Sequence, residues 1–189
     1  MPLTHEQFET GAENVGATVV RFDQTESFGT RAYMGRGGCR AISTVWLRNQ
    51  KLLQSGTPRP NQDIQLEEIS WLAEQQHKGK SWENTEIFLR SHALRPDGIF
   101  WFKNGVNWEK LWFFLCAKPG YYLVGFDDPG EGSGHEIAFC TVNALKMFDP
   151  NFGAATFPDS QSMKRLFFAY WPKAYPELAQ SPASIFRYV

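Results

Sequence analysis

Pro119 and Gly120 mark the point at which the sequence changes its pattern, and this change restricts the fold more than any other feature. Before them, apolar residues recur mostly at helical spacing, whereas after them short runs rich in Tyr, Val, Ile and Phe are separated by turn residues. The second pattern predicts an antiparallel meander with strands over 121–126, 135–142 and 145–148. Helices followed by an antiparallel sheet predict an α+β fold.

The predicted helices lie mainly in the first half of the chain. Ile42 and Val45 fall at helical spacing after Cys39, so we expect an amphipathic helix to begin at Cys39 and to end before Ser55. The other predicted elements are a short strand over 17–22, a helix from Asp63 as its N-cap to about residue 76, a helix over 82–94, a helix over 108–116 capped by Asn107, a helix over 160–171 and a last strand over 184–189. The first fifteen residues are largely polar.

Length and composition indicate one compact domain over residues 1–189. A chain of 189 residues can bury a sizeable core, and its seven Trp and sixteen Phe predict a dense core or an apolar groove. The formal net charge is −1, with acidic and basic residues interspersed. We therefore expect no nucleic-acid partner and no attraction to an anionic membrane.

The cysteines and the N-terminus indicate where the protein is made. Three cysteines, in no CxxC spacing, form neither a disulfide framework nor a metal pattern, so we expect reduced thiols, no metal and no cofactor. The N-terminus has no basic and apolar signal region, and no stretch reaches the ~20 apolar residues of a spanning helix. The sequence predicts a protein made in the cytosol, with no integral membrane segment.

Cys39 is the candidate nucleophile. Cysteine attacks as the thiolate, and a helix N-terminus favours that anion through its dipole and its unpaired N–H groups. Four glycines between residues 29 and 38 let the backbone approach a substrate, and the N–H of Cys39 itself can form one arm of an oxyanion hole. The alternative is a small buried residue at a helix start. Cys116 and Cys140 lie in apolar runs, and we interpret both as core thiols.

His135 and Asp149 complete a candidate triad. His135 follows a glycine-rich turn over 127–134 and opens a strand, and Asp149 ends the strand expected to pair with it. Because the start of one strand and the end of the next are neighbours in a tight antiparallel pair, Asp149 can accept a hydrogen bond from the imidazole and fix its tautomer. Taken singly, each residue is better explained by turn chemistry. The order along the chain, with a helix-start Cys, a strand-start His and a strand-end Asp, favours the triad.

At these residues the sequence resembles the YopT/AvrPphB-type papain-like cysteine proteases, a family of bacterial effectors. The likeness is carried by the segments 38–47, 134–138 and 148–153. It implies a papain-like fold in which a helical part bears the cysteine and an antiparallel sheet bears the histidine and the aspartate across a cleft. It also implies a virulence protein that leaves the bacterial cytoplasm without a Sec signal, through a specialised secretion system, and acts on a protein of a target cell. An immunity or chaperone protein is left open as a second partner.

One position departs from the family pattern. Papain-type enzymes often complete the oxyanion hole with a glutamine six residues before the nucleophile, where this sequence has Tyr33. Gln24 is the nearest upstream glutamine and is therefore the candidate oxyanion residue. The alternative for Gln24 is an ordinary polar loop residue.

The residues leave three functions open. The first is proteolysis by an effector or toxin through a Cys-His-Asp triad. The second keeps the thioester chemistry but attacks a side-chain amide, which makes the protein a glutamine or asparagine deamidase, or a transglutaminase if an amine replaces water. The third is a non-catalytic interaction module whose aromatic-rich surface binds a partner.

Overall fold

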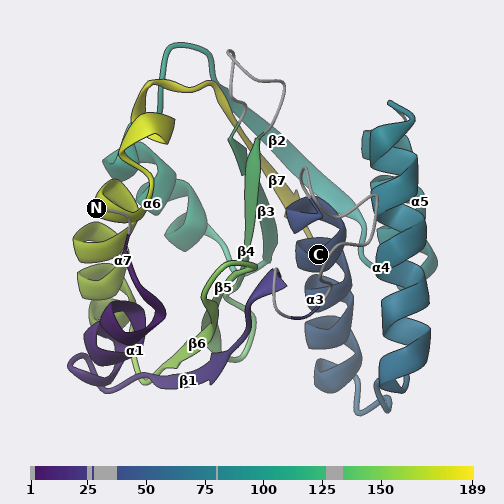
Figure 1. Ribbon diagram of the computed structural model, residues 1–189, viewed down its shortest axis with the longest axis horizontal. Coiled ribbons are helices and arrows are strands. Elements are labelled where there is room, and N and C mark those ends of the chain that lie inside the picture. Colours follow the sequence, from purple (N-terminus) through teal and green to yellow (C-terminus); the bar gives the residue numbers. More distant parts are fainter. Residues whose placement is uncertain (1–2, 25–26, 28–37, 80, 127–133) are drawn as a thin grey trace.

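The computed structural model describes residues 3–24, 27, 38–79, 81–126 and 134–189. Within these ranges, seven strands form one antiparallel sheet in the order β1-β6-β5-β4-β3-β7-β2 (Figure 1). The strands are β1 (Thr18–Arg21), β2 (Pro96–Phe102), β3 (Tyr121–Phe126), β4 (His135–Cys140), β5 (Leu145–Asp149), β6 (Gly153–Phe157) and β7 (Ala183–Tyr188). This mixture of helices and antiparallel sheet confirms the predicted α+β fold.

Helices cover both faces of the sheet (Figure 1). One face carries α3 (Cys39–Gln54), α4 (Gln62–His77) and α5 (Ser81–Ser91), and the other carries α1 (His5–Glu13), α6 (Trp108–Ala117) and α7 (Ser160–Ala174). Strand β3 is buried along its whole length, with Tyr122 and Val124 in the core beneath α7 and Tyr121 and Leu123 in the core beneath α3. Because side chains alternate along a strand, neighbouring residues of the central strands reach different helical layers.

Helix α1 forms in a segment whose polar composition did not predict a helix. A reciprocal capping box starts it, since the Thr4 side chain accepts from the Gln7 N–H at 3.2 Å and the Gln7 side chain accepts from the Thr4 N–H at 2.9 Å. Phe8 and Ala12, one turn apart, are fully buried against the sheet. Two apolar residues are too few to mark a helix by periodicity, yet they suffice to dock it.

Strands β2 and β6 were also missing from the prediction. β2 ends in the strand formers Ile-Phe-Trp-Phe, but Pro96 and Gly98 at its start obscure the pattern; its register against β7 is irregular there, and it lies at the edge of the sheet. β6 reads Gly-Ala-Ala-Thr-Phe and is held between β5 and β1. Since β1 and β2 form the two edges, the first half of the chain supplies part of the sheet as well as most of the helices.

The predicted N-cap of α4 is wrong, whereas that of α6 is confirmed. Asn61, and not Asp63, caps α4, because its side-chain oxygen accepts from the Ile64 N–H at 2.9 Å. Asp63 lies within the first turn, where its carboxylate faces the positive end of the helix dipole. Asn107 caps α6 by accepting from the Lys110 N–H at 2.9 Å.

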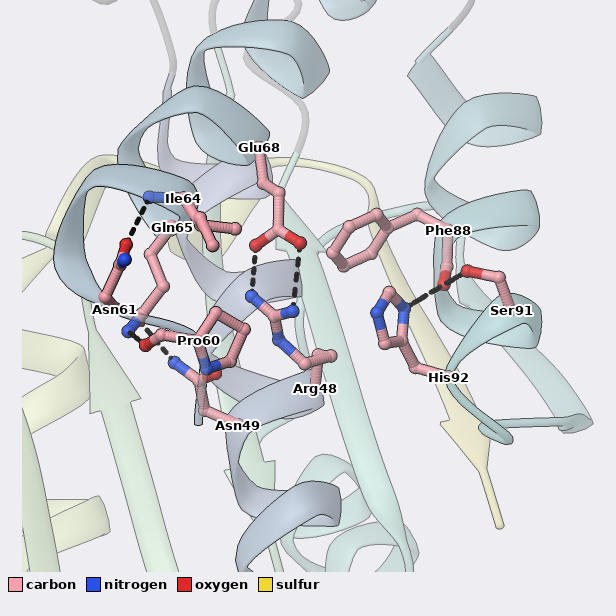
Figure 2. A network of polar contacts seen from close by, with 10 residues as sticks. All are labelled: Arg48, Asn49, Pro60, Asn61, Ile64, Gln65, Glu68, Phe88, Ser91 and His92. Atoms are coloured by element: carbon pink, nitrogen blue, oxygen red, sulfur yellow. Dashed lines mark hydrogen bonds and ion pairs between the residues drawn. The ribbon is translucent and has the colours of Figure 1, made fainter. Parts of the chain in front are cut away.

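A buried ion pair ties α3 to α4 (Figure 2). The guanidinium of Arg48 is 1% exposed and donates to both carboxylate oxygens of Glu68, one of them at 3.0 Å. The Cζ atom of Arg48 also lies 5.5 Å from the ring centroid of Phe88 on α5. The next residue of α3, Asn49, donates to the Gln65 side-chain oxygen at 2.8 Å. These contacts fix the helix that begins at Cys39 within its layer.

We expect Glu68→Ala to lower the free energy of unfolding by about 3 kcal/mol, because the substitution leaves the Arg48 charge buried without its carboxylate. The adjacent Glu67 is exposed on the same helix, so Glu67→Ala is the matched control and is expected to change stability by less than about 0.5 kcal/mol. Urea denaturation of the three proteins, compared at constant m-value, measures both effects. Equal stability of the two variants would refute the assigned role of the pair.

Candidate active site

Cys39 is the first residue of α3 and is 3% exposed. The N-cap position is Gly38, which has no side chain to accept from the N–H groups of the first turn. The unpaired N–H groups and the helix dipole therefore act on the thiol, as expected from the sequence. The Cys39 Sγ lies 3.7 Å from the Gly134 carbonyl oxygen, directly before β4. The other glycines of both predicted turns, at 29–37 and 127–133, lie outside the described residues.

The start of α3 is tied to the start of β4 by residues adjacent to the candidate triad. The Arg40 Nε donates to the carboxylate of Glu136, whose side chain is 3% exposed. The Ser43 hydroxyl donates to the Glu136 carbonyl oxygen at 3.1 Å. Since Arg40 follows Cys39 and Glu136 follows His135, these bonds hold the thiol and the imidazole in a fixed relation.

His135 and Asp149 meet across the β4-β5 pair. The register places Ala138 opposite Phe148, so the start of β4 and the end of β5 lie at the same end of the sheet. The two side chains lie on the same face and are diagonal neighbours, within reach of each other. The His135 Nε2 is 3.1 Å from the Asp149 Oδ1; the carboxylate is fully buried and the imidazole is 10% exposed.

The charge state of His135 follows from these neighbours. Burial disfavours the charged imidazole, but the Asp149 carboxylate, its hydrogen bond and a hydrogen bond with Cys39 outweigh burial and raise the pKa of His135 to about 10. His135 is therefore an imidazolium at neutral pH. Because Asp149 engages Nε2, the other ring nitrogen, Nδ1, is the one left for Cys39. A thiol beside an imidazolium can be held as the thiolate.

Two residues that the sequence did not single out as functional surround Asp149. The Asn151 N–H donates to the Asp149 Oδ1 at 2.9 Å, and the Tyr175 hydroxyl donates to the Asp149 Oδ2 at 2.9 Å. Asn151 is the third residue of the Asp-Pro-Asn turn by which Asp149 was recognised in the sequence, so the same motif could have indicated Asn151. Tyr175 lies 26 residues further along the chain, and no local pattern indicates it.

Gln24 lies beside the turn that follows Asp149. Its backbone N–H donates to the Pro150 carbonyl oxygen at 2.9 Å, and its Nε2 donates to the Asn151 Oδ1 at 2.6 Å. The structure thus places Gln24 on the Asp149 side of the site, and its oxyanion role stays a prediction. Tyr33, the position in which the family pattern has a glutamine, lies outside the described residues.

The other thiols lie elsewhere. Cys140 is 4% exposed in the core beneath α3, as predicted. The prediction of a core thiol is wrong for Cys116, which is exposed on α6 together with Phe113, one turn earlier. The apolar run of α6 exceeds the one face that the sheet covers, so part of it points outward. Desolvation by neighbouring groups raises the pKa of the Cys116 and Cys140 thiols. Both are therefore expected to react slowly, and the reactivity of Cys39 can be compared with theirs.

The histidines that were not selected have contacts of their own. The His5 Nε2 pairs with the Asp23 Oδ2 at 2.8 Å, and the His92 Nδ1 lies 2.8 Å from the Phe88 carbonyl oxygen (Figure 2). His77 is exposed at the end of α4. His135 is the histidine that the structure brings to both Cys39 and Asp149.

A helix that begins at a cysteine, packed against an antiparallel sheet that bears a histidine and an aspartate, is the papain-like α+β arrangement. Two solved structures share it. The avirulence protein AvrPphB of Pseudomonas superposes with a TM-score of 0.59 at 12% sequence identity, over 94% of this chain and 99% of that one. PatoxP, a cysteine protease-like domain of the Photorhabdus asymbiotica toxin PaTox, superposes with a TM-score of 0.52 at 15% identity. That match covers 97% of this chain and 57% of the other.

These likenesses confirm the predicted papain-like fold. No protein-family model and no curated protein matches the sequence. The described part of the chain has no helix long and apolar enough to cross a bilayer. Nor do the described ranges bring together three or more His, Cys, Asp or Glu residues in a group that could hold a metal ion.

Proposed function

We propose that the protein is a papain-like thiol hydrolase in which Cys39 is the nucleophile, His135 the general acid and base, and Asp149 the residue that orients and charges the imidazole. The observation that carries this proposal is the position of His135, which is hydrogen-bonded to a fully buried carboxylate and lies near enough to Cys39 for the thiol to help raise its pKa. The pair of an imidazolium and a thiol at a helix N-terminus is suited to acyl transfer through a thioester.

The reaction proceeds in two halves. The Cys39 thiolate attacks an amide carbonyl carbon, and the developing oxyanion lies near the N–H groups that start α3. Collapse of this intermediate breaks the C–N bond while the His135 Nδ1 gives its proton to the leaving amine, which leaves a thioester and a neutral imidazole. Water then attacks the thioester as Nδ1 removes its proton. Breaking the C–S bond releases the acid and restores the thiolate beside the imidazolium.

The substrate in this proposal is a protein of a target cell, reached after export from a bacterium. Support comes from the fold shared with a Pseudomonas avirulence protein and with a domain of a Photorhabdus toxin. The same thioester step acts on a backbone amide or on a side-chain amide, so the chemistry of the site fits a protease and also a deamidase or transglutaminase.

Comparative proteomics tests the proposal and separates these reactions. Wild type, Cys39→Ala and the control Cys116→Ser are expressed in target cells, and the proteins are read for new N-termini and for altered side chains. A protease gives new termini with wild type and Cys116→Ser but not with Cys39→Ala, whereas a deamidase leaves intact chains heavier by about 1 Da. Identical proteomes for wild type and Cys39→Ala would contradict a hydrolase that depends on Cys39.

A further inference from the structure

A directed chain of hydrogen bonds runs behind the candidate triad. The Gln24 Nε2 donates to the Asn151 Oδ1 at 2.6 Å, and the Asn151 Nδ2 donates to the Tyr175 hydroxyl oxygen at 2.9 Å. The Tyr175 hydroxyl in turn donates to the Asp149 Oδ2 at 2.9 Å. The chain ends at Asp149, which as a carboxylate only accepts. The phenol oxygen of Tyr175 accepts from the Asn151 amide, so the single hydroxyl proton of Tyr175 is free to point to the Asp149 carboxylate.

Tyr175 also covers the imidazole. Its ring centroid lies 4.5 Å from that of His135 with a tilt of 32°, and the same ring stacks on Trp171 at 5.7 Å and 20°. The backbone N–H of Tyr175 donates to the Trp171 carbonyl oxygen at 3.2 Å, which fixes the residue between α7 and the 3-10 helix η1 (Pro176–Gln180). Tyr175 is 9% exposed, so its ring keeps water from one side of the His135–Asp149 hydrogen bond.

We propose that Tyr175 is a positioning residue of the triad: its hydroxyl, supported by Asn151 and Gln24, holds the Asp149 carboxylate aligned on His135. This inference rests on the function proposed above. It gives Gln24 a second role, as the outer end of the chain. It also explains why the third residue of the Asp-Pro-Asn turn is an asparagine. Asn151 donates to Asp149 through its backbone N–H and to Tyr175 through its side chain.

The ionisable groups around this site agree with the proposal. His135 faces Asp149 from β5, Cys39 from α3 and Tyr175 from beyond α7, and Asp149 is also near Tyr170 of α7. Burial and the Asp149 charge raise the pKa of Tyr175 well above 10, so the phenol keeps the proton that it donates. The negative charge therefore stays on Asp149, next to His135.

Tyr175→Phe tests the hydroxyl while keeping the ring, and Tyr170→Phe is its matched control. Tyr170 is 3% exposed near Asp149, and its hydroxyl has no hydrogen-bond partner among the described residues. Without this hydrogen bond the Asp149 carboxylate can turn away from His135 and then raises the pKa of the imidazole less. We expect the His135 pKa of about 10 to fall by about 1 pH unit in Tyr175→Phe. Tyr170→Phe leaves this pKa in place.

NMR makes this measurement and separates the inference from the proposed function. The ring signals of His135 are followed across the pH range in wild type and both variants, and they report the His135 pKa without any reaction. A lower His135 pKa in Tyr175→Phe supports the positioning role, even if Cys39 of the wild type is alkylated by iodoacetamide no faster than Cys116, a result that contradicts the proposed function alone. A folded Tyr175→Phe protein with the wild-type His135 titration would overturn the inference.

Discussion

A His135→Ala variant is expected to lose about 10,000-fold in kcat/KM, the scale of loss when one member of a catalytic triad is removed. The physical reason is twofold. The leaving amine no longer receives a proton from Nδ1, and Cys39 loses the neighbouring imidazolium, a cation of the kind that activates a thiol. Turnover is measured on the substrate found by proteomics. The rate of Cys39 alkylation at pH 7 gives a second readout that needs no substrate, and it is expected to fall at least about 10-fold.

The matched control for that prediction is His92→Ala. His92 lies just past α5 and is held by the Phe88 carbonyl oxygen, so its removal changes a local contact and leaves the triad intact. We expect wild-type turnover and wild-type alkylation for this variant. If His135→Ala alkylated at the wild-type rate while still folded, the imidazolium would have no part in activating Cys39 and the proposed mechanism would be wrong.

The sequence was sufficient to predict the elements that carry the site, because each has a local signal. α3 follows a glycine-rich turn and has a clear helical stripe, and β4 and β5 are rich in strand formers on either side of turns. β6 has no such signal, since glycine and alanine fill most of it and pairing with neighbouring strands makes it extended, whereas in β2 Pro96 and Gly98 interrupt the start of a run that ends in strand formers. Local propensity cannot report a contact that is made across the sheet.

The same distinction applies to the site residues. Cys39, His135 and Asp149 each occupy the end of a predicted element, where their chemistry and position can be read together. Tyr175 is one of several aromatic residues near the end of α7, and only the folded chain shows that its hydroxyl, unlike that of Tyr170, reaches Asp149. Buried polar partners of a triad depend on which layers meet, and that information is spread over the whole sequence.

Replacing Asp149 by Asn is expected to remove the charge and to keep the hydrogen bonds at Oδ1. The Asp149 Oδ1 accepts from the Asn151 N–H and from His135, so an amide oxygen suits that side, whereas an amide nitrogen cannot accept the proton of the Tyr175 hydroxyl. The loss in Asp149→Asn therefore reports the charge together with the hydrogen bond from Tyr175. We expect kcat/KM to fall by about 10,000-fold.

The pH dependence of the variant gives the sharper test. In wild type the imidazolium persists until the pH passes the His135 pKa of about 10, so activity is kept through neutral pH. Without the carboxylate charge, burial dominates and brings the pKa of His135 below its ordinary value of 6.5, which moves the alkaline limb of the activity profile down by at least about 3 pH units. Asp159→Asn removes a charge from the N-cap of α7 and keeps the cap, so it controls for charge alone and leaves the limb in place. An unshifted limb in Asp149→Asn would mean that His135 owes its charge to another group, and Asp149 would then have no place in the mechanism.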